Sequence, residues 1–139
     1  MKTLVVLAVS IVLVGIFFCP MAMAAPPMPA DLQIVQPDPS LPKELAGFCG
    51  KWEGSDPVMK LFLIVEKIGK EKASLYIWRS GFEQIPKGWE RIEAKVSKED
   101  GKYKLFFLNK MGGFTVFALI GEYLYGLTPG GNARFSRVP

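Results

Sequence analysis

The stretch that decides the fold is Gly50-Lys51-Trp52-Glu53-Gly54, which is followed to the end of the chain by short segments of alternating apolar and polar residues. Alternation over a few residues is typical of strands that turn one face toward a core. Arg134 and Arg137 lie in the last of these segments. A Gly-x-Trp on the first strand and an arginine on the last one indicate a sheet that closes on itself.

The alternating segments predict eight strands joined by short turns. Their expected ranges are 51–55, 59–68, 72–80, 89–97, 103–108, 114–120, 123–127 and 133–138. The fourth segment alternates most cleanly, with Ile92, Ala94 and Val96 on one face, and Asp100-Gly101 supplies the positive φ angles of a tight hairpin. Short links favour pairing in sequence order, and closure removes exposed edges. We therefore expect an all-β fold: a small eight-stranded antiparallel up-and-down barrel over residues 41–139.

The chain before residue 41 divides into two parts. Leu4 to Phe18 is almost wholly apolar, and Ala22-Met23-Ala24 places small residues where a signal peptidase cuts. Residues 1–24 are thus expected to be a signal peptide, which predicts a periplasmic or secreted protein that meets a membrane only if the signal stays uncleaved. Residues 25–40 hold five prolines, and we expect a flexible, extended and solvated leader there.

Composition excludes several classes of function. The chain has 17 basic and 13 acidic residues of interleaved sign, without the basic stripe that nucleic acid needs, so no nucleic-acid partner is expected. It has no histidine, which removes the commonest general base and metal ligand. Cys49 is the one cysteine after residue 24, so no internal disulfide is expected. Its thiol is either a small buried apolar group beside Phe48 or an exposed group able to link two chains.

Two further patterns are candidates for catalytic sites. Glu53 with Asp56, and Glu66 with Glu83, are carboxylates that could pair as acid and base, but charged strand residues usually form the solvated face. The Gly-rich run 129–132 lacks the Lys-Ser/Thr of a phosphate loop and indicates a hairpin turn. The sequence therefore predicts a protein that is not an enzyme and uses no cofactor or metal.

Phe48-x-Gly50-x-Trp52 follows a short helical turn, expected from Ser40 to Leu45 with Ser40 as its cap and Gly47 as its end. This arrangement resembles the start of lipocalins and related calycin barrels. The resemblance implies that Gly50 and Trp52 lie where the first strand enters the closed end of the barrel, with Arg134 or Arg137 covering the indole. The chain is shorter than a lipocalin and lacks the lipocalin disulfide, so it is best described as a small lipocalin-like barrel.

A set of aromatic side chains is the one suggestive candidate for a binding site. If the open end is wide, they would line a pocket for an apolar molecule, and if it is narrow, they would fill it. The loop 80–89 and the turn 110–113 are the expected rim. The predicted ligand-binding residues are Tyr76, Trp78, Phe82, Trp89, Tyr103, Phe107, Tyr123 and Tyr125.

Two functions follow from these expectations. The first is an exported, non-enzymatic barrel that binds a small apolar ligand or a partner protein at its open end. The alternative is a module that resembles certain periplasmic protease inhibitors, in which an exposed N-terminal segment reaches into the target's cleft. Residues 25–39 would be that segment here, although those inhibitors carry a disulfide that this chain cannot form.

Overall fold

The computed structural model describes residues 25–110 and 112–139, so the expected signal peptide lies outside the described residues. The described part contains one short helix and eight strands, and the ends of each strand lie within two residues of the predicted ones. Their bounds are α2 Lys43–Ala46, β1 Gly50–Ser55, β2 Lys60–Ile68, β3 Lys72–Arg79, β4 Gly88–Glu99, β5 Lys102–Leu108, β6 Phe114–Ile120, β7 Tyr123–Thr128 and β8 Gly131–Val138.

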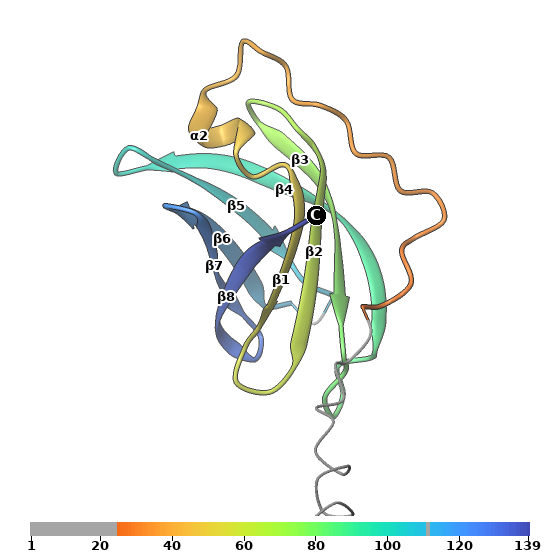
Figure 1. Cartoon of the computed structure of the whole chain (residues 1–139). Coiled ribbons are helices and arrows are strands. Elements are labelled where there is room, and N and C mark those ends of the chain that lie inside the picture. The colour runs from red at the N-terminus through yellow and green to blue at the C-terminus, as the bar shows by residue number, and fades with distance from the viewer. Residues whose placement is uncertain (1–24, 111) are drawn as a thin grey trace, which may run out of the picture.

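The strands form a closed antiparallel barrel in sequence order, β1 to β8 (Figure 1). Closure comes from the pairing of the first strand with the last, in which Trp52 lies opposite Arg137. On its other side Trp52 lies opposite Leu63 of β2. The predicted all-β up-and-down barrel is therefore confirmed.

The interior of the barrel is filled with side chains. Alternation turns one face of each strand inward, and the inward side chains make one continuous cluster. Among its fully buried members are Trp52, Leu61, Leu63, Leu75, Ile77, Leu105, Phe117, Leu124 and Phe135. The ring of Phe117 lies 6.0 Å from that of Phe107 and 5.6 Å from that of Phe135. An eight-stranded barrel can be filled by its own side chains or can hold one small ligand. This barrel is filled by side chains along its axis.

The helical turn covers one end of the barrel, as expected. Leu45 is buried, and the Gly47 N–H bonds back to the Lys43 carbonyl at 2.9 Å. The residue that precedes the helix is Pro42, which has no side-chain cap, so the expected cap by Ser40 is wrong. Ser40 instead donates its backbone N–H to Asp38 Oδ1 at 2.8 Å.

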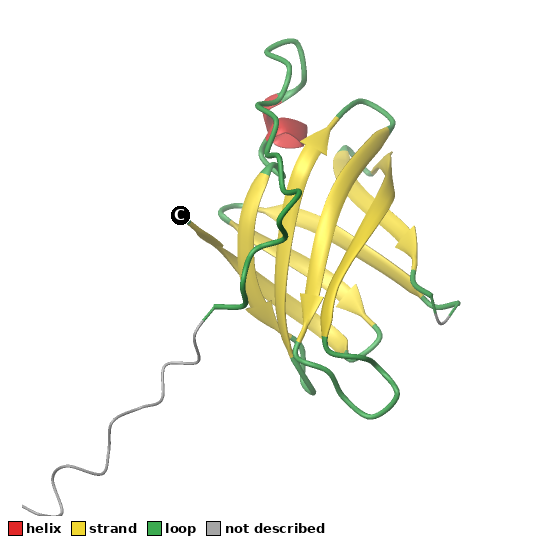
Figure 2. Cartoon of the chain, turned by 90° about the vertical axis from the view of Figure 1, so that its right-hand side faces the viewer, coloured by secondary structure: helices red, strands yellow, loops and turns green. Residues whose placement is uncertain are grey.

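The leader, residues 25–40, lies along the outer face of β2, β3 and β4, from the α2 end to the opposite end (Figures 1 and 2). Its extended form was predicted, and most of its residues are exposed as expected, but the leader is also hydrogen-bonded to the barrel. Pro26 is buried, the Val35 N–H donates to the Glu66 carbonyl at 2.7 Å, and Trp89 Nε1 donates to the Pro27 carbonyl at 2.7 Å. The physical reason is that β2 is apolar on both faces, and such a strand needs cover on both.

Candidate functional site

The closed end is built around Trp52. Its ring is buried, its Nε1 donates to the Phe48 carbonyl at 2.9 Å, and the Arg137 guanidinium lies 4.2 Å from the ring centroid. Arg137 also donates to the carbonyls of Cys49 at 2.7 Å and Gly47 at 2.5 Å. These contacts satisfy the polar groups of the motif within the protein, so this end of the barrel has a structural role. We call the arrangement of Trp52 beneath Arg137 the lock.

Glycine at position 50 is required by this lock. Gly50 has a φ of 123°, and a Cβ there would lie 2.6 Å from Arg137 Nη1. The arginine that covers the indole is therefore Arg137. Arg134, the other candidate, lies instead over the ring of Tyr123, 5.0 Å from its centroid.

The structure does not bring the eight predicted ligand-binding residues together, so no pocket lined by that set forms. The reason is strand parity, because several of these residues have the phase that points out of the barrel. Tyr76, Trp78 and Trp89 lie on the outer face of the barrel beneath the leader, and Tyr123 and Tyr125 point outward from β7. Phe107 lies in the core, and Tyr103 packs against the core. Phe82 is exposed in the β3–β4 loop.

A small pocket does lie at the open end, opposite α2. Its volume is about 120 Å³, and it is enclosed by the β3–β4 loop, the β5–β6 turn and Pro129 of the β7–β8 turn. The first two are the segments that the sequence predicted as the rim. Ile85 and Pro86 supply apolar walls. We call this the mouth pocket.

An ion pair forms the base of the mouth pocket. Arg79 Nη1 lies 2.7 Å from Glu90 Oε2, with the two side chains only 8% and 16% exposed. Lys110 Nζ is 3.8 Å from the other oxygen of Glu90, and Lys87 also lines the pocket. Two basic side chains, Arg79 and Lys110, thus flank one carboxylate, and Lys87, whose Nζ lies 5.9 Å from the ring centroid of Trp78, adds a third positive charge to the lining. This positive balance favours anionic groups.

The carboxylates weighed as catalytic pairs do not converge. Asp56 is buried and organises the β1–β2 turn, where Oδ1 accepts from the backbone N–H of Val58 and Met59 and Oδ2 from Thr128 Oγ1 at 2.6 Å. Glu53 is exposed on β1. Asp56 and Glu53 therefore lie in different environments and do not form an acid–base pair.

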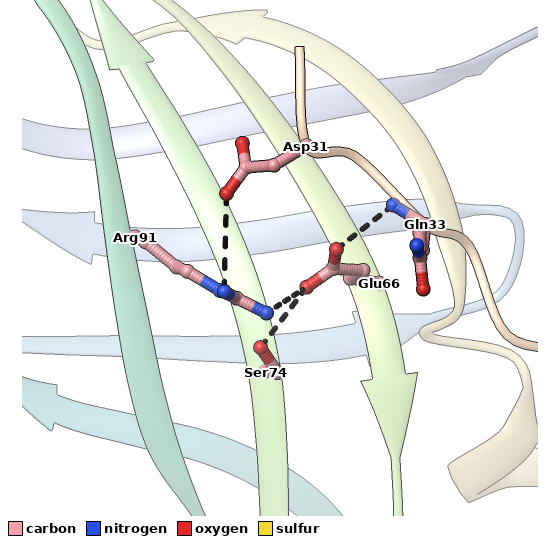
Figure 3. A network of polar contacts seen from close by, with 5 residues as sticks. All are labelled: Asp31, Gln33, Glu66, Ser74 and Arg91. Atoms are coloured by element: carbon pink, nitrogen blue, oxygen red, sulfur yellow. Dashed lines mark hydrogen bonds and ion pairs between the residues drawn. The ribbon is translucent and has the colours of Figure 1, made fainter. Parts of the chain in front are cut away.

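Glu66 is the centre of a polar network beneath the leader (Figure 3), whereas Glu83, the other carboxylate considered with it, is exposed in the β3–β4 loop. Glu66 Oε1 accepts from the Gln33 N–H at 2.9 Å. Its Oε2 accepts from Arg91 at 3.0 Å and from the Ser74 hydroxyl at 3.2 Å. The charge of Glu66 raises the pKa of Arg91 further. The network fastens the leader to the barrel.

The outer edge of this network involves Asp31 and Tyr76. Asp31 Oδ2 is 3.9 Å from Arg91. Contact with the Tyr76 hydroxyl lowers the pKa of Asp31, and the carboxylate raises the pKa of Tyr76. That contact is looser than a full hydrogen bond, because the buried hydroxyl has no partner in hydrogen-bonding geometry.

Cys49 is half-buried between the leader and β2. Its Sγ donates to the carbonyls of Val65 at 3.4 Å and Val35 at 3.5 Å. Burial raises the pKa of the thiol, which disfavours the thiolate needed for nucleophilic chemistry. Cys49 is therefore closer to the small packed group that the sequence allows than to an exposed thiol able to link two chains.

Residues 25–110 and 112–139 contain no cluster of three or more His, Cys, Asp or Glu able to hold a metal ion. The same residues include no helix of the length and apolarity that a membrane crossing requires. No family model, curated protein or solved structure matches the chain. The assignment of an up-and-down barrel therefore stands on the strand pairing itself.

Proposed function

We propose that this protein is an exported, non-enzymatic member of the lipocalin-like calycin barrels that binds a ligand or a partner protein at its open end. The supporting features are the Gly50 and Trp52 motif, the stacking of Arg137 on that indole, and the up-and-down order of the strands. The signal-like residues 1–24 support export.

The observation that carries the proposal is the mouth pocket. Its apolar walls and the charged pair at its base combine features common to binding sites. A volume of about 120 Å³ is below the ~300–1,000 Å³ of sites that enclose a whole small molecule. The pocket therefore suits one small apolar group, such as the end of a ligand or a single side chain of a protein partner.

The charges at the mouth refine that chemistry. Lys87 and Lys110 stand beside the apolar walls, while Arg79 is already paired with Glu90. An apolar group that carries a neighbouring carboxylate would place its charge near these lysines. The preferred occupant is thus an anionic amphiphile or an acidic segment of a partner protein.

Native mass spectrometry of protein purified from its own host tests the proposal. The wild-type protein should retain a bound molecule or partner, and Ile85→Trp, which fills the mouth pocket, should lose it. Ile34→Trp is the matched control, since Ile34 is exposed on the leader, and it should retain the occupant. Circular dichroism confirms that both variants fold. Retention by Ile85→Trp, or an empty wild-type protein, would contradict binding at the mouth.

The contacts of the leader weigh against the protease-inhibitor alternative. An arm that enters a protease cleft must be free, whereas Pro27, Gln33 and Val35 are hydrogen-bonded to the barrel. Inhibition would require the loss of these bonds before the leader could engage a target.

A further inference from the structure

A second apolar surface lies on the outside of the barrel, across β5, β6 and β7. The strand registers show that alternate residues of these strands point outward. We call their apolar members the bare wall: Phe106, Leu108, Phe114, Val116, Ala118, Ile120, Tyr125 and Leu127.

The bare wall is continuous from strand to strand. Leu108 pairs with Phe114 and Phe106 with Val116 across β5 and β6, and Val116 in turn pairs with Leu127 of β7. The rings of Phe106 and Phe114 stack with centroids 5.2 Å apart. These residues therefore form one surface and are not scattered apolar side chains.

This surface is also large. Its five most exposed members are Leu108 at 61%, Phe114 at 59%, Leu127 at 55%, Ile120 at 50% and Tyr125 at 39% exposure. With ~150–250 Å² for a whole side chain of this size, they expose roughly 400–650 Å². That area overlaps the upper part of the ~300–600 Å² range for the largest apolar patch of a typical monomer. It is a large part of the ~800 Å² that each partner buries in a stable complex, and the partly buried Phe106, Val116 and Ala118 add to it.

The centre of the bare wall is uncharged, and basic residues lie at its edges, where Lys95 is opposite Phe106 and Arg134 is opposite Tyr125. No charged residue occupies an outward position of β6 or of β7, both of which the structure describes in full. At its rim, Lys104 is paired with Glu99 at 2.6 Å. In a contact with twofold symmetry the same patch meets itself, so an uncharged centre places no like charges opposite each other.

We infer that the bare wall is the interface of a homodimer, in which two copies of this chain pack wall to wall across a twofold axis. The uncharged centre is what the core of such an interface needs, and the exposed apolar area supplies a large part of what each partner buries. The leader lies on the other side of the barrel (Figure 1), so each copy keeps its leader in place when the walls meet.

Analytical ultracentrifugation of the mature chain across the micromolar range tests the inference. The wild-type protein should sediment as a dimer. Leu127→Glu and, separately, Phe114→Glu should weaken association by roughly 30-fold or more, as expected for residues at the centre of an interface. Both side chains are exposed in the single chain, so circular dichroism should show that both variants remain folded.

Ile34→Glu is the matched control, since it places the same charge on an exposed apolar residue of the leader. This variant should remain a dimer. A monomeric wild-type protein would overturn the inference, as would a dimer that survives both wall variants. A monomer that binds phosphatidylglycerol vesicles through the bare wall would also overturn it, in favour of a lipid surface.

Discussion

On the outer face of β2, β3 and β4, the aromatic and aliphatic side chains lie beneath the leader, whereas on the bare wall they lie open. Phe62, Ile64, Tyr76 and Trp78 are buried although they point away from the barrel interior. Leu108 and the other prominent members of the bare wall are exposed. We call the first surface the covered wall. The two walls differ less in composition than in what lies over them.

The comparison shows how a strand that is apolar on both faces is accommodated in a small barrel. β2 and β6 both carry apolar residues inward and outward. The chain covers the outward face of β2 with its own leader, fastened by the buried carboxylate of Glu66. β6 has no comparable cover among the described residues, which is why a second copy of the chain is the inferred occupant.

The largest expected effect tests whether the two walls belong to one cooperative barrel. Trp52→Ala removes a buried ring and the surface on which Arg137 stacks, and should lower the free energy of unfolding by about 3–5 kcal/mol. Urea unfolding followed by tryptophan and by tyrosine signals should give one shared transition. Phe82→Ala, in an exposed loop, should change stability by less than about 0.5 kcal/mol. Separate transitions for the two walls would break the comparison.

A second variant distinguishes the walls from each other. Glu66→Gln removes the charge that pairs with Arg91 and turns an amide donor toward other donors, at a cost of about 1–3 kcal/mol. Amide exchange at Val35 should accelerate while exchange in β6 stays unchanged. Glu93→Gln breaks only an exposed pair with Lys72 and should cost at most about 1 kcal/mol. Equal effects of the two variants would show that Glu66 does not hold the leader.

A third variant sharpens the comparison at the end of the leader. Trp89→Phe keeps the ring beside Tyr76 but loses the hydrogen bond to the Pro27 carbonyl, which predicts a loss of about 0.5–1.5 kcal/mol by urea unfolding. Tyr125→Phe removes a polar group from the bare wall in the same way and should change stability by less than about 0.5 kcal/mol. Unchanged stability of Trp89→Phe would mean that Pro27 is not held.

The smallest effect is a dependence of leader attachment on pH. The pKa of Asp31 in the attached leader lies below its ordinary value of 3.8, so its contribution is present above that value and is lost as pH falls through the lowered pKa. The protection factors of the Gln33 and Val35 amides, which correct for the intrinsic slowing of exchange in acid, should therefore fall below about pH 4. Asp31→Asn should flatten this pH dependence. If the pH profile of amide protection is the same in that variant, Asp31 is not its cause.

Much of the barrel could be predicted because its signals are local. The alternation of Ile92, Ala94 and Val96 fixes which face of β4 points inward, and the structure places Ala94 and Val96 in the core. Asp100 and Gly101 have φ angles of 51° and 75°, as the expected tight hairpin requires. Each of these depends on neighbouring residues alone, which is why sequence patterns identify them.

The site was less predictable because it depends on contacts between distant segments. Tyr76 and Trp78 were expected at the open end, but their strand phase places them outside with Trp89. The position of the leader had one usable signal, since the segment 59–68 is apolar on both phases and therefore needs an outer cover. The ion pair of Arg79 and Glu90 also had a local signal, because the alternation that turns Ile77 and Ile92 inward gives Arg79 and Glu90 the same inward phase. Sequence alternation alone did not show that the two would meet as a pair.

The lock at Trp52 has a consequence for how the molecule is made. The ring closes only when β8, the last strand in sequence, pairs with β1, the first, and brings Arg137 to Trp52. Until then β1 has a partner on one side only, and an unpaired strand invites wrong neighbours. The barrel is therefore completed by β8, and removal of the part of β8 that carries Arg137 should leave an open, aggregation-prone sheet.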